Sequence, residues 1–154
     1  MNLFKVAMAL CLAVAFTAPA SALSGQSVPL AWYGVAFSYY EPGPAQGAWV
    51  IADEGDLSLV PPTLRLEAEE ALRALEPRET LLFLSAGMRR TGGYRAVVSE
   101  VLCDGRRVLV NWGVQGPPPG AMVSQALTHP MSLVRIPAPL SVIELQEVPL
   151  PSDE

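Results

Sequence analysis

The sequence predicts a mainly β (α+β) fold, a compact antiparallel sheet or sandwich with one packed helix. Apolar, strand-like runs separated by turn residues occupy most of the chain, and a single segment has a helical period. The dipeptide Asp104-Gly105 also joins two strand-like runs, which is a strong hairpin signal. Strands that precede and follow one helix along the chain are typical of a layered domain in which the helix covers a sheet.

Two strands are expected before the helix. Val28–Tyr40 alternates, with its larger residues on one face (Tyr33, Val35, Phe37 and Tyr39) and Gly34, Ala36 and Ser38 on the other. Gly47–Ala52 predicts the second strand. Residues 53–62 predict a loop with one helical turn near Asp56–Leu59.

The helical segment begins after a proline pair. One face carries Leu64, Ala68, Ala71, Leu72 and Leu75, and the other carries Glu67, Glu69, Glu70 and Arg73. Thr63 is the predicted N-cap, and Pro77 is the predicted stop. Glu69 and Arg73 are spaced for an ion pair on what we interpret as a solvated face.

Strands follow to the end of the chain. Residues 81–84 are apolar on both faces, which indicates a central strand, whereas residues 116–120 are too rich in proline for a strand. Further strands are expected at 132–136 and 140–148. A two-residue hairpin loop would pair Cys103 with Arg106, Val101 with Val108, Ser99 with Val110 and Val97 with Trp112, on a face expected to point inward.

The first residues have the layout of a secretory signal peptide. Lys5 is the only charge, an apolar run follows from Val6 to Phe16, and Ala20-Ser21-Ala22 supplies small residues for cleavage. The run is too short for a membrane anchor. We therefore expect residues 1–22 to be removed, residues 23–148 to form one domain and residues 149–154 to form an acidic tail. The mature chain would be secreted, periplasmic or at the cell surface.

Composition excludes several function classes. Without Lys5 the ten basic residues fall to nine against fifteen acidic ones, a net charge of −6, which disfavours nucleic-acid binding. After cleavage Cys103 is the only cysteine and His129 the only histidine, too few for a zinc site or an internal disulfide. We expect Cys103 to be a buried, unreactive thiol and His129 to be a hydrogen-bonding loop residue. We predict no catalytic residues, no metal site and no cofactor.

Two stretches are more elaborate than simple connectors require. Gly87–Tyr94 contains a double glycine beside threonine and tyrosine, and Ser124–Pro130 mixes polar and apolar residues before a proline. The chain order places both at one end of the sheet. We therefore predict that they form a partner-binding surface made of Arg90, Thr91, Gly92, Gly93, Tyr94, Gln125, Thr128, His129 and Pro130. Turn chemistry alone is the alternative interpretation.

These stretches carry a resemblance to a known family. Gly87–Tyr94 with its Thr91-Gly92-Gly93-Tyr94 run, the Asp104-Gly105 hairpin and the stretch from Pro119 to Pro130 resemble the C-terminal domain of the PrcB-like family over about residues 80–137. The family takes its name from an accessory, stabilising subunit of a secreted protease complex. The resemblance implies a non-catalytic exported protein whose partner is another exported protein, with a protease as the candidate.

An alternative function belongs to a different class. The Thr91-Gly92-Gly93 turn on a β-scaffold is similar in chemistry to the glycine-rich wedge loops of chagasin-type cysteine-protease inhibitors. The sequence therefore leaves two interpretations open, an accessory stabiliser and a loop-based inhibitor.

Export can be tested on the protein itself. We expect the mature N-terminus to be Leu23, because Ala20-Ser21-Ala22 is a small-residue cleavage site after the break at Pro19. Intact-mass measurement of the protein from the envelope or secreted fraction checks this. Retention of Met1 in that fraction would contradict it.

Overall fold

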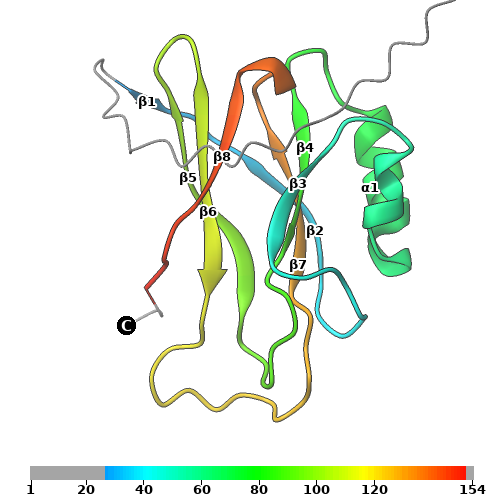
Figure 1. Ribbon diagram of the computed structural model, residues 1–154, viewed down its shortest axis with the longest axis vertical. Helices are drawn as coiled ribbons and strands as arrows, with labels where there is room; N and C mark the ends of the chain where they lie inside the picture. The colour runs from blue at the N-terminus through cyan, green and yellow to red at the C-terminus, as the bar shows by residue number, and fades with distance from the viewer. Residues whose placement is uncertain (1–26, 152–154) are drawn as a thin grey trace, which may run out of the picture.

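The computed structural model describes residues 27–151, which form two sheets packed face to face and one helix on the outer side of the second sheet (Figure 1). The first sheet has the order β1 (Val28–Pro29), β5 (Arg95–Cys103), β6 (Val108–Gln115) and β8 (Ile143–Glu147). The second has the order β2 (Tyr33–Ser38), β7 (Met131–Ile136), β4 (Thr80–Ser85) and β3 (Gly47–Ile51). The mainly β prediction with one packed helix is confirmed.

The strand pairs of the described residues are antiparallel with one exception. β8 lies parallel to β6, with Val110 opposite Leu145. The predicted signal peptide and the last three residues of the acidic tail lie outside the described residues. Among the described residues, no helix is long and apolar enough to cross a membrane.

β4 lies inside its sheet, between β7 and β3, as its apolar residues predicted. All six of its side chains are buried, and its two faces contribute to different hydrophobic clusters. Leu82 and Leu84 face the first sheet, whereas Leu81 and Phe83 belong to the cluster under the helix. The ring of Phe83 stacks on that of Trp49 from β3, with 5.6 Å between the centroids.

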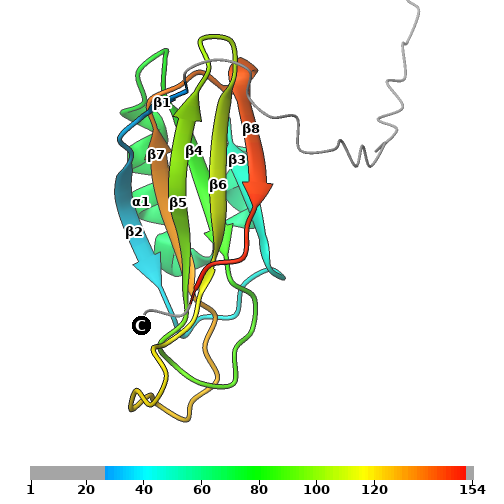
Figure 2. The ribbon, with the colours of Figure 1, turned by 90° about the vertical axis from the view of Figure 1, so that its left-hand side faces the viewer.

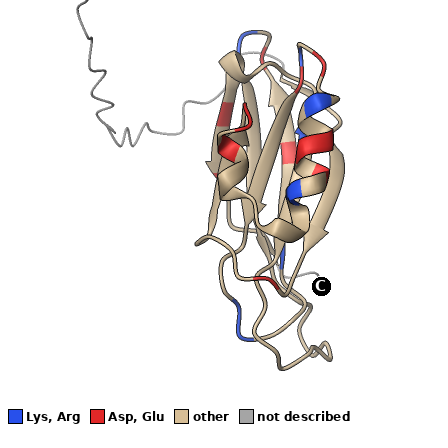
Figure 3. Ribbon diagram, turned by 90° about the vertical axis from the view of Figure 1, so that its right-hand side faces the viewer, with Lys and Arg blue, Asp and Glu red and all other residues tan. Residues whose placement is uncertain are grey.

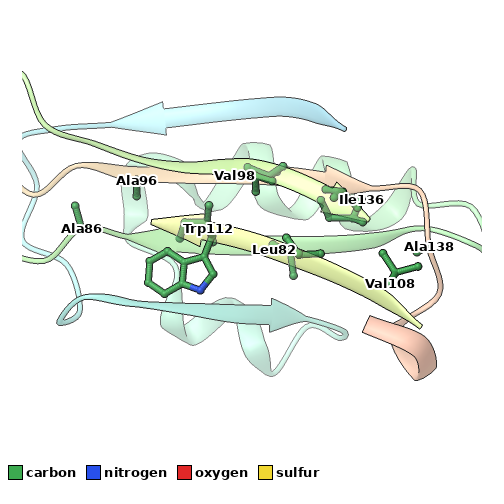
Figure 4. Packing of buried hydrophobic residues seen from close by; sticks show 12 residues of the cluster. Leu82, Ala86, Ala96, Val98, Val108, Trp112, Ile136 and Ala138 are labelled. Atoms are coloured by element: carbon green, nitrogen blue, oxygen red, sulfur yellow. The ribbon is translucent and has the colours of Figure 1, made fainter. Parts of the chain in front are cut away.

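The cluster between the sheets joins residues from both layers. Figure 4 shows Leu82 and Ile136 from the second sheet close to Val98, Val108 and Trp112 from the first. Trp112 is 4% exposed, so its indole is a core group. Burying an aromatic side chain of this size contributes several kcal/mol to folding, because a large apolar area leaves water.

The helix α1 (Pro62–Arg73) covers the second sheet through Leu64, Ala68 and Ala71, as its period predicted. Its outer face carries acidic and basic residues side by side (Figure 3), including an ion pair between Glu69 and Arg73 at 3.4 Å. A single 3₁₀ turn, η1 (Asp56–Leu59), precedes it where one helical turn was predicted.

The predicted N-cap of the helix is wrong. The helix begins at Pro62, one residue before Thr63, because proline is favourable at the first helical position, where its missing N–H is not needed. The Thr63 N–H instead donates to the carboxylate of Glu41 at 3.0 Å, and the Thr63 hydroxyl bonds to the same group. The helix ends at Arg73, so Pro77 lies beyond its end and is not the residue that stops it.

The hairpin register is also corrected. Cys103 pairs with Val108 and Val101 with Val110, so four residues separate the strands instead of two. A bulge at Ser99 then reverses the alternation, and Ala96 and Val98 face the core in place of Val97 and Ser99. Cys103 is a free thiol but half-buried, since it lies at the strand end beside the turn.

The predicted strand over residues 28–40 is interrupted. After β1 the chain leaves the first sheet, with the Leu30 N–H bonded to the Val101 carbonyl at 2.9 Å, and crosses to become β2 at the edge of the second (Figure 1). The predicted last strand is confirmed only as β8, because Leu140–Val142 forms a 3₁₀ turn, η2.

The contact between Glu41 and the helix predicts a measurable stabilisation. We expect Glu41→Ala to lower the free energy of unfolding by about 1 kcal/mol, because two donors at the helix start lose a charged acceptor. Denaturant unfolding measures this. Glu70→Ala, at an exposed site on the same helix, is the control. Equal stabilities of the two variants would contradict the prediction.

The turn of the hairpin predicts a pH dependence. The N–H groups of Arg107 and Arg106 donate to the Asp104 carboxylate at 2.7 and 2.9 Å and lower the pKa of this group below its ordinary value. A lowered pKa stabilises the fold above the pKa of the unfolded chain, and this contribution is lost as the pH falls through the folded-state pKa.

We therefore expect Asp104→Asn to be less stable than the wild type at neutral pH. The difference should shrink as the pH falls below about 3.9, the ordinary value for Asp, toward the folded-state pKa. Urea unfolding at a series of pH values measures it, and Glu70→Gln controls for the loss of one negative charge. A difference that stays constant with pH would contradict the assignment.

Candidate loop surface

The two stretches singled out in the sequence lie together at one end of the sandwich. Figure 1 shows the segment before β5 and the segment between β6 and β7 below the sheets, at the end away from the β5–β6 hairpin. Arg89 and Thr128 form a short antiparallel bridge, with N–H to carbonyl distances of 2.8 and 2.9 Å. The Gly92 N–H donates to the Ser124 carbonyl at 2.9 Å. The predicted proximity is confirmed.

Thr128 is the centre of this junction. Its side chain is buried, and its hydroxyl donates to the Thr91 carbonyl at 2.9 Å. The sequence placed Thr128 and Pro130 on the partner surface, but both are buried. Their place in the structure is to hold the two loops, and they cannot present side chains to a partner.

Glycine is required where the loops approach one another. Gly93 has φ +86°, in the left-handed region, and a Cβ there would lie 2.8 Å from Pro117 and 2.9 Å from Val123. A Cβ on Gly92 would lie 2.6 Å from the Ser124 hydroxyl. The double glycine therefore lets one loop pack against the other.

The remaining predicted residues take different positions. Arg90, Gly93 and Gln125 are exposed, while Thr91, Gly92, Tyr94 and His129 are half-buried. The guanidinium of Arg89 lies over the Tyr94 ring, 5.3 Å from its centroid, and also donates to Gln46 at 2.5 Å. Gln125 donates within its own loop to the Val123 carbonyl. Trp112, on the face of β6 that was predicted to point inward, is in the core.

His129 is a loop residue held by hydrogen bonds, as its sequence context predicted. Its N–H donates to the Tyr39 carbonyl at 2.6 Å, and its Nδ1 accepts from the Gly43 N–H at 3.3 Å. Cys103 lies at the hairpin end of β5 and His129 precedes β7 at the opposite end, so the two cannot form a nucleophilic pair. No group of three or more His, Cys, Asp or Glu residues among those described could hold a metal ion.

The sequence interpretation missed the apolar part of this surface. Four large apolar side chains are exposed at this end of the molecule: Tyr40, Met88, Met122 and Leu127. Two of them, Tyr40 and Met122, line a depression of about 490 Å³, together with Tyr39, Gly93, Pro117 and Ser124 among others. We call the exposed residues Tyr40, Met88, Arg90, Met122, Gln125 and Leu127, with this depression, the loop surface. Apolar residues in otherwise polar loops were the available signal.

Comparison with known proteins identifies the part of the chain that builds this surface. Residues 80–137 match the family model described as PrcB C-terminal, which confirms the predicted resemblance over this segment. The segment runs from β4 to the end of β7 and contains both loops. No curated protein and no solved structure is detectably similar to the chain.

Proposed function

We propose that this protein is an exported, non-catalytic accessory subunit that binds a partner protease through the loop surface and stabilises it. The observation that carries the proposal is the position of the exposed apolar residues. Met88, Met122 and Leu127 all belong to the segment that matches the PrcB C-terminal family and are held at one end by the Arg89–Thr128 bridge.

The chemistry of the surface supports a protein partner. Exposed apolar side chains on neighbouring loops, two of which (Tyr40 and Met122) line a depression, are typical of interaction sites, where a few such residues provide most of the binding energy. Because Thr128 already fixes both loops, binding would order few further residues and so lose little conformational entropy.

The same geometry favours a stabiliser over a loop-based inhibitor. A wedge loop has to project into the active-site cleft of its target. Gly92 and Gly93 instead pack against Ser124 and Pro117 of the neighbouring loop. The surface is therefore broad and supported from beneath, which suits a subunit contact better than insertion into a cleft.

The surface can be tested with a pair of charge substitutions. The partner is the protease that co-purifies with the mature protein from its envelope or secreted fraction. We expect Met122→Asp and Leu127→Asp each to weaken its binding at least tenfold, about 1.4 kcal/mol, with little change in melting temperature. Both side chains are exposed, so the fold should tolerate the change. Leu66→Asp, at an exposed site on α1, is the matched control. Normal binding by both loop variants would contradict the proposal.

The role in the complex needs a separate readout. A stabiliser should lengthen the half-life of the partner's peptidase activity at elevated temperature and leave the initial rate unchanged. A dose-dependent fall in the initial rate would instead show inhibition and overturn the stabilising role.

A further inference from the structure

A groove runs along the open side of the sandwich, next to the loop surface. It has a volume of about 700 Å³, and its walls come from β2, β5 and β7, with Trp32, Val35, Phe37, Val97 and Leu133 among them. Figure 2 faces this side and shows β7 between β2 and β5. The groove arises because β1 pairs with only Cys103 and Leu102 before the chain crosses to the other sheet. Within residues 27–151, the rest of β5 has no neighbouring strand on this side.

The uncovered edge of β5 presents backbone hydrogen-bonding groups. The carbonyls of Ala96 and Val101 both point away from β6, since they accept bonds from the Ser132 hydroxyl and the Leu30 N–H, respectively. Backbone groups alternate along a strand, so those of Val98 point to the same side as those of Ala96. An uncovered edge of this kind is a template for another extended segment.

The wall of the groove opposite β5 is formed by β2, which carries apolar side chains that a bound segment could contact. Ala36 packs under α1, and Ser38 bonds to Thr63 at the helix. Phe37, between them, therefore projects from the other face of β2, toward the space beside β5. Val35, at the bulge between Gly34 and Ala36, also lines the groove. Phe37 is 70% exposed, and its ring contacts Tyr39 with 5.6 Å between centroids. A segment paired with β5 would cover this apolar face.

Charge and position together indicate the occupant. Among the described residues that line the groove, Glu67 is the only charged one. The groove lies next to the loop depression, since Ala96 of the groove follows Arg95, which borders the depression, and Phe37 contacts Tyr39, which borders it too. A partner bound at the loop surface is thus positioned to extend a segment into the groove.

We propose that the groove binds an extended segment of the partner protein, which pairs with β5, packs apolar side chains on Phe37 and Val35, and places a basic residue near Glu67. The proposal rests on the proposed function for the existence of a protein partner. Residues 96–100 of the edge correspond to a segment of about five residues, roughly 17 Å long.

A defined peptide tests the groove without the partner. The probe is a capped seven-residue peptide in which valine alternates with threonine, with one lysine in place of the central threonine. We expect it to change the fluorescence of Trp32 and to slow amide exchange at Ala96 and Val98. The same peptide with glutamate in place of lysine should bind at least tenfold more weakly, and Glu67→Gln should remove this difference.

Two variants test the groove in different ways, one by filling it and the other by removing an apolar contact. A Cβ on Gly34 meets no atom within 4 Å, so Gly34→Leu should fold while its side chain fills the groove. Phe37→Ala removes the exposed ring without adding volume. We expect each to weaken binding of the lysine peptide at least tenfold, with Ser141→Leu, at an exposed site in η2, as the control. Met122→Asp should bind the peptide normally, which separates this test from that of the loop surface.

Several outcomes would overturn the proposal. The lysine peptide could fail to bind the wild-type protein, or it could bind Gly34→Leu and Phe37→Ala as well as the wild type. Protection of the Ala96 and Val98 amides without peptide would mean that another part of the chain covers the edge. Self-association abolished by Gly34→Leu would make the occupant a second copy. The loop surface would stand in each of these cases.

Discussion

The burial of β4 on both faces is the constraint on which the rest of the structure depends. Thr80–Ser85 has no exposed side chain, so one layer of protein must cover each face. The first sheet covers Leu82 and Leu84, and α1 with η1 covers Leu81 and Phe83. The strand also leads directly into the first loop, where the Ser85 hydroxyl accepts the Gly87 N–H and donates to the Pro44 carbonyl. The loop surface is therefore anchored to the most buried strand of the molecule.

Much of this arrangement could be predicted because its signals are local. The apolar residues of β4, the period of α1, the 3₁₀ turn at Asp56–Leu59 and the proline loop each depend on a few neighbouring residues. The errors lie where a residue's conformation depends on a contact with a residue far away in the sequence. The bulge at Ser99 depends on how β5 pairs with β6, and the position of Thr63 depends on Glu41, which approaches from another loop. Single-sequence patterns do not carry such contacts.

The loop surface shows the same difference between local features, which could be predicted, and long-range contacts, which could not. The double glycine and the Gln125–Pro130 stretch indicated correctly which loops meet, since chain order and turn chemistry are visible in the sequence. Which side chains face outward could not be predicted. Thr128 and Pro130 were expected at the surface and are buried, whereas Met122 and Leu127 are exposed. The groove beside β5 was not predicted either, because it depends on the short length of β1 and on the crossing of the chain from one sheet to the other.

The crossing after β1 also has a consequence for how the chain reaches its fold. β1 pairs with the end of β5, and β2 pairs with β7, so that Tyr33 lies opposite Arg135 about a hundred residues later. Such pairings give the topology a high contact order, and the entropy of closing these long loops slows folding. During synthesis, which starts at the N-terminus, the aromatic strand β2 has no partner strand until β7, near the end of the sequence, has been made. The second sheet therefore cannot be completed before β7 is available, and until then β2 presents apolar surface that a chaperone can cover.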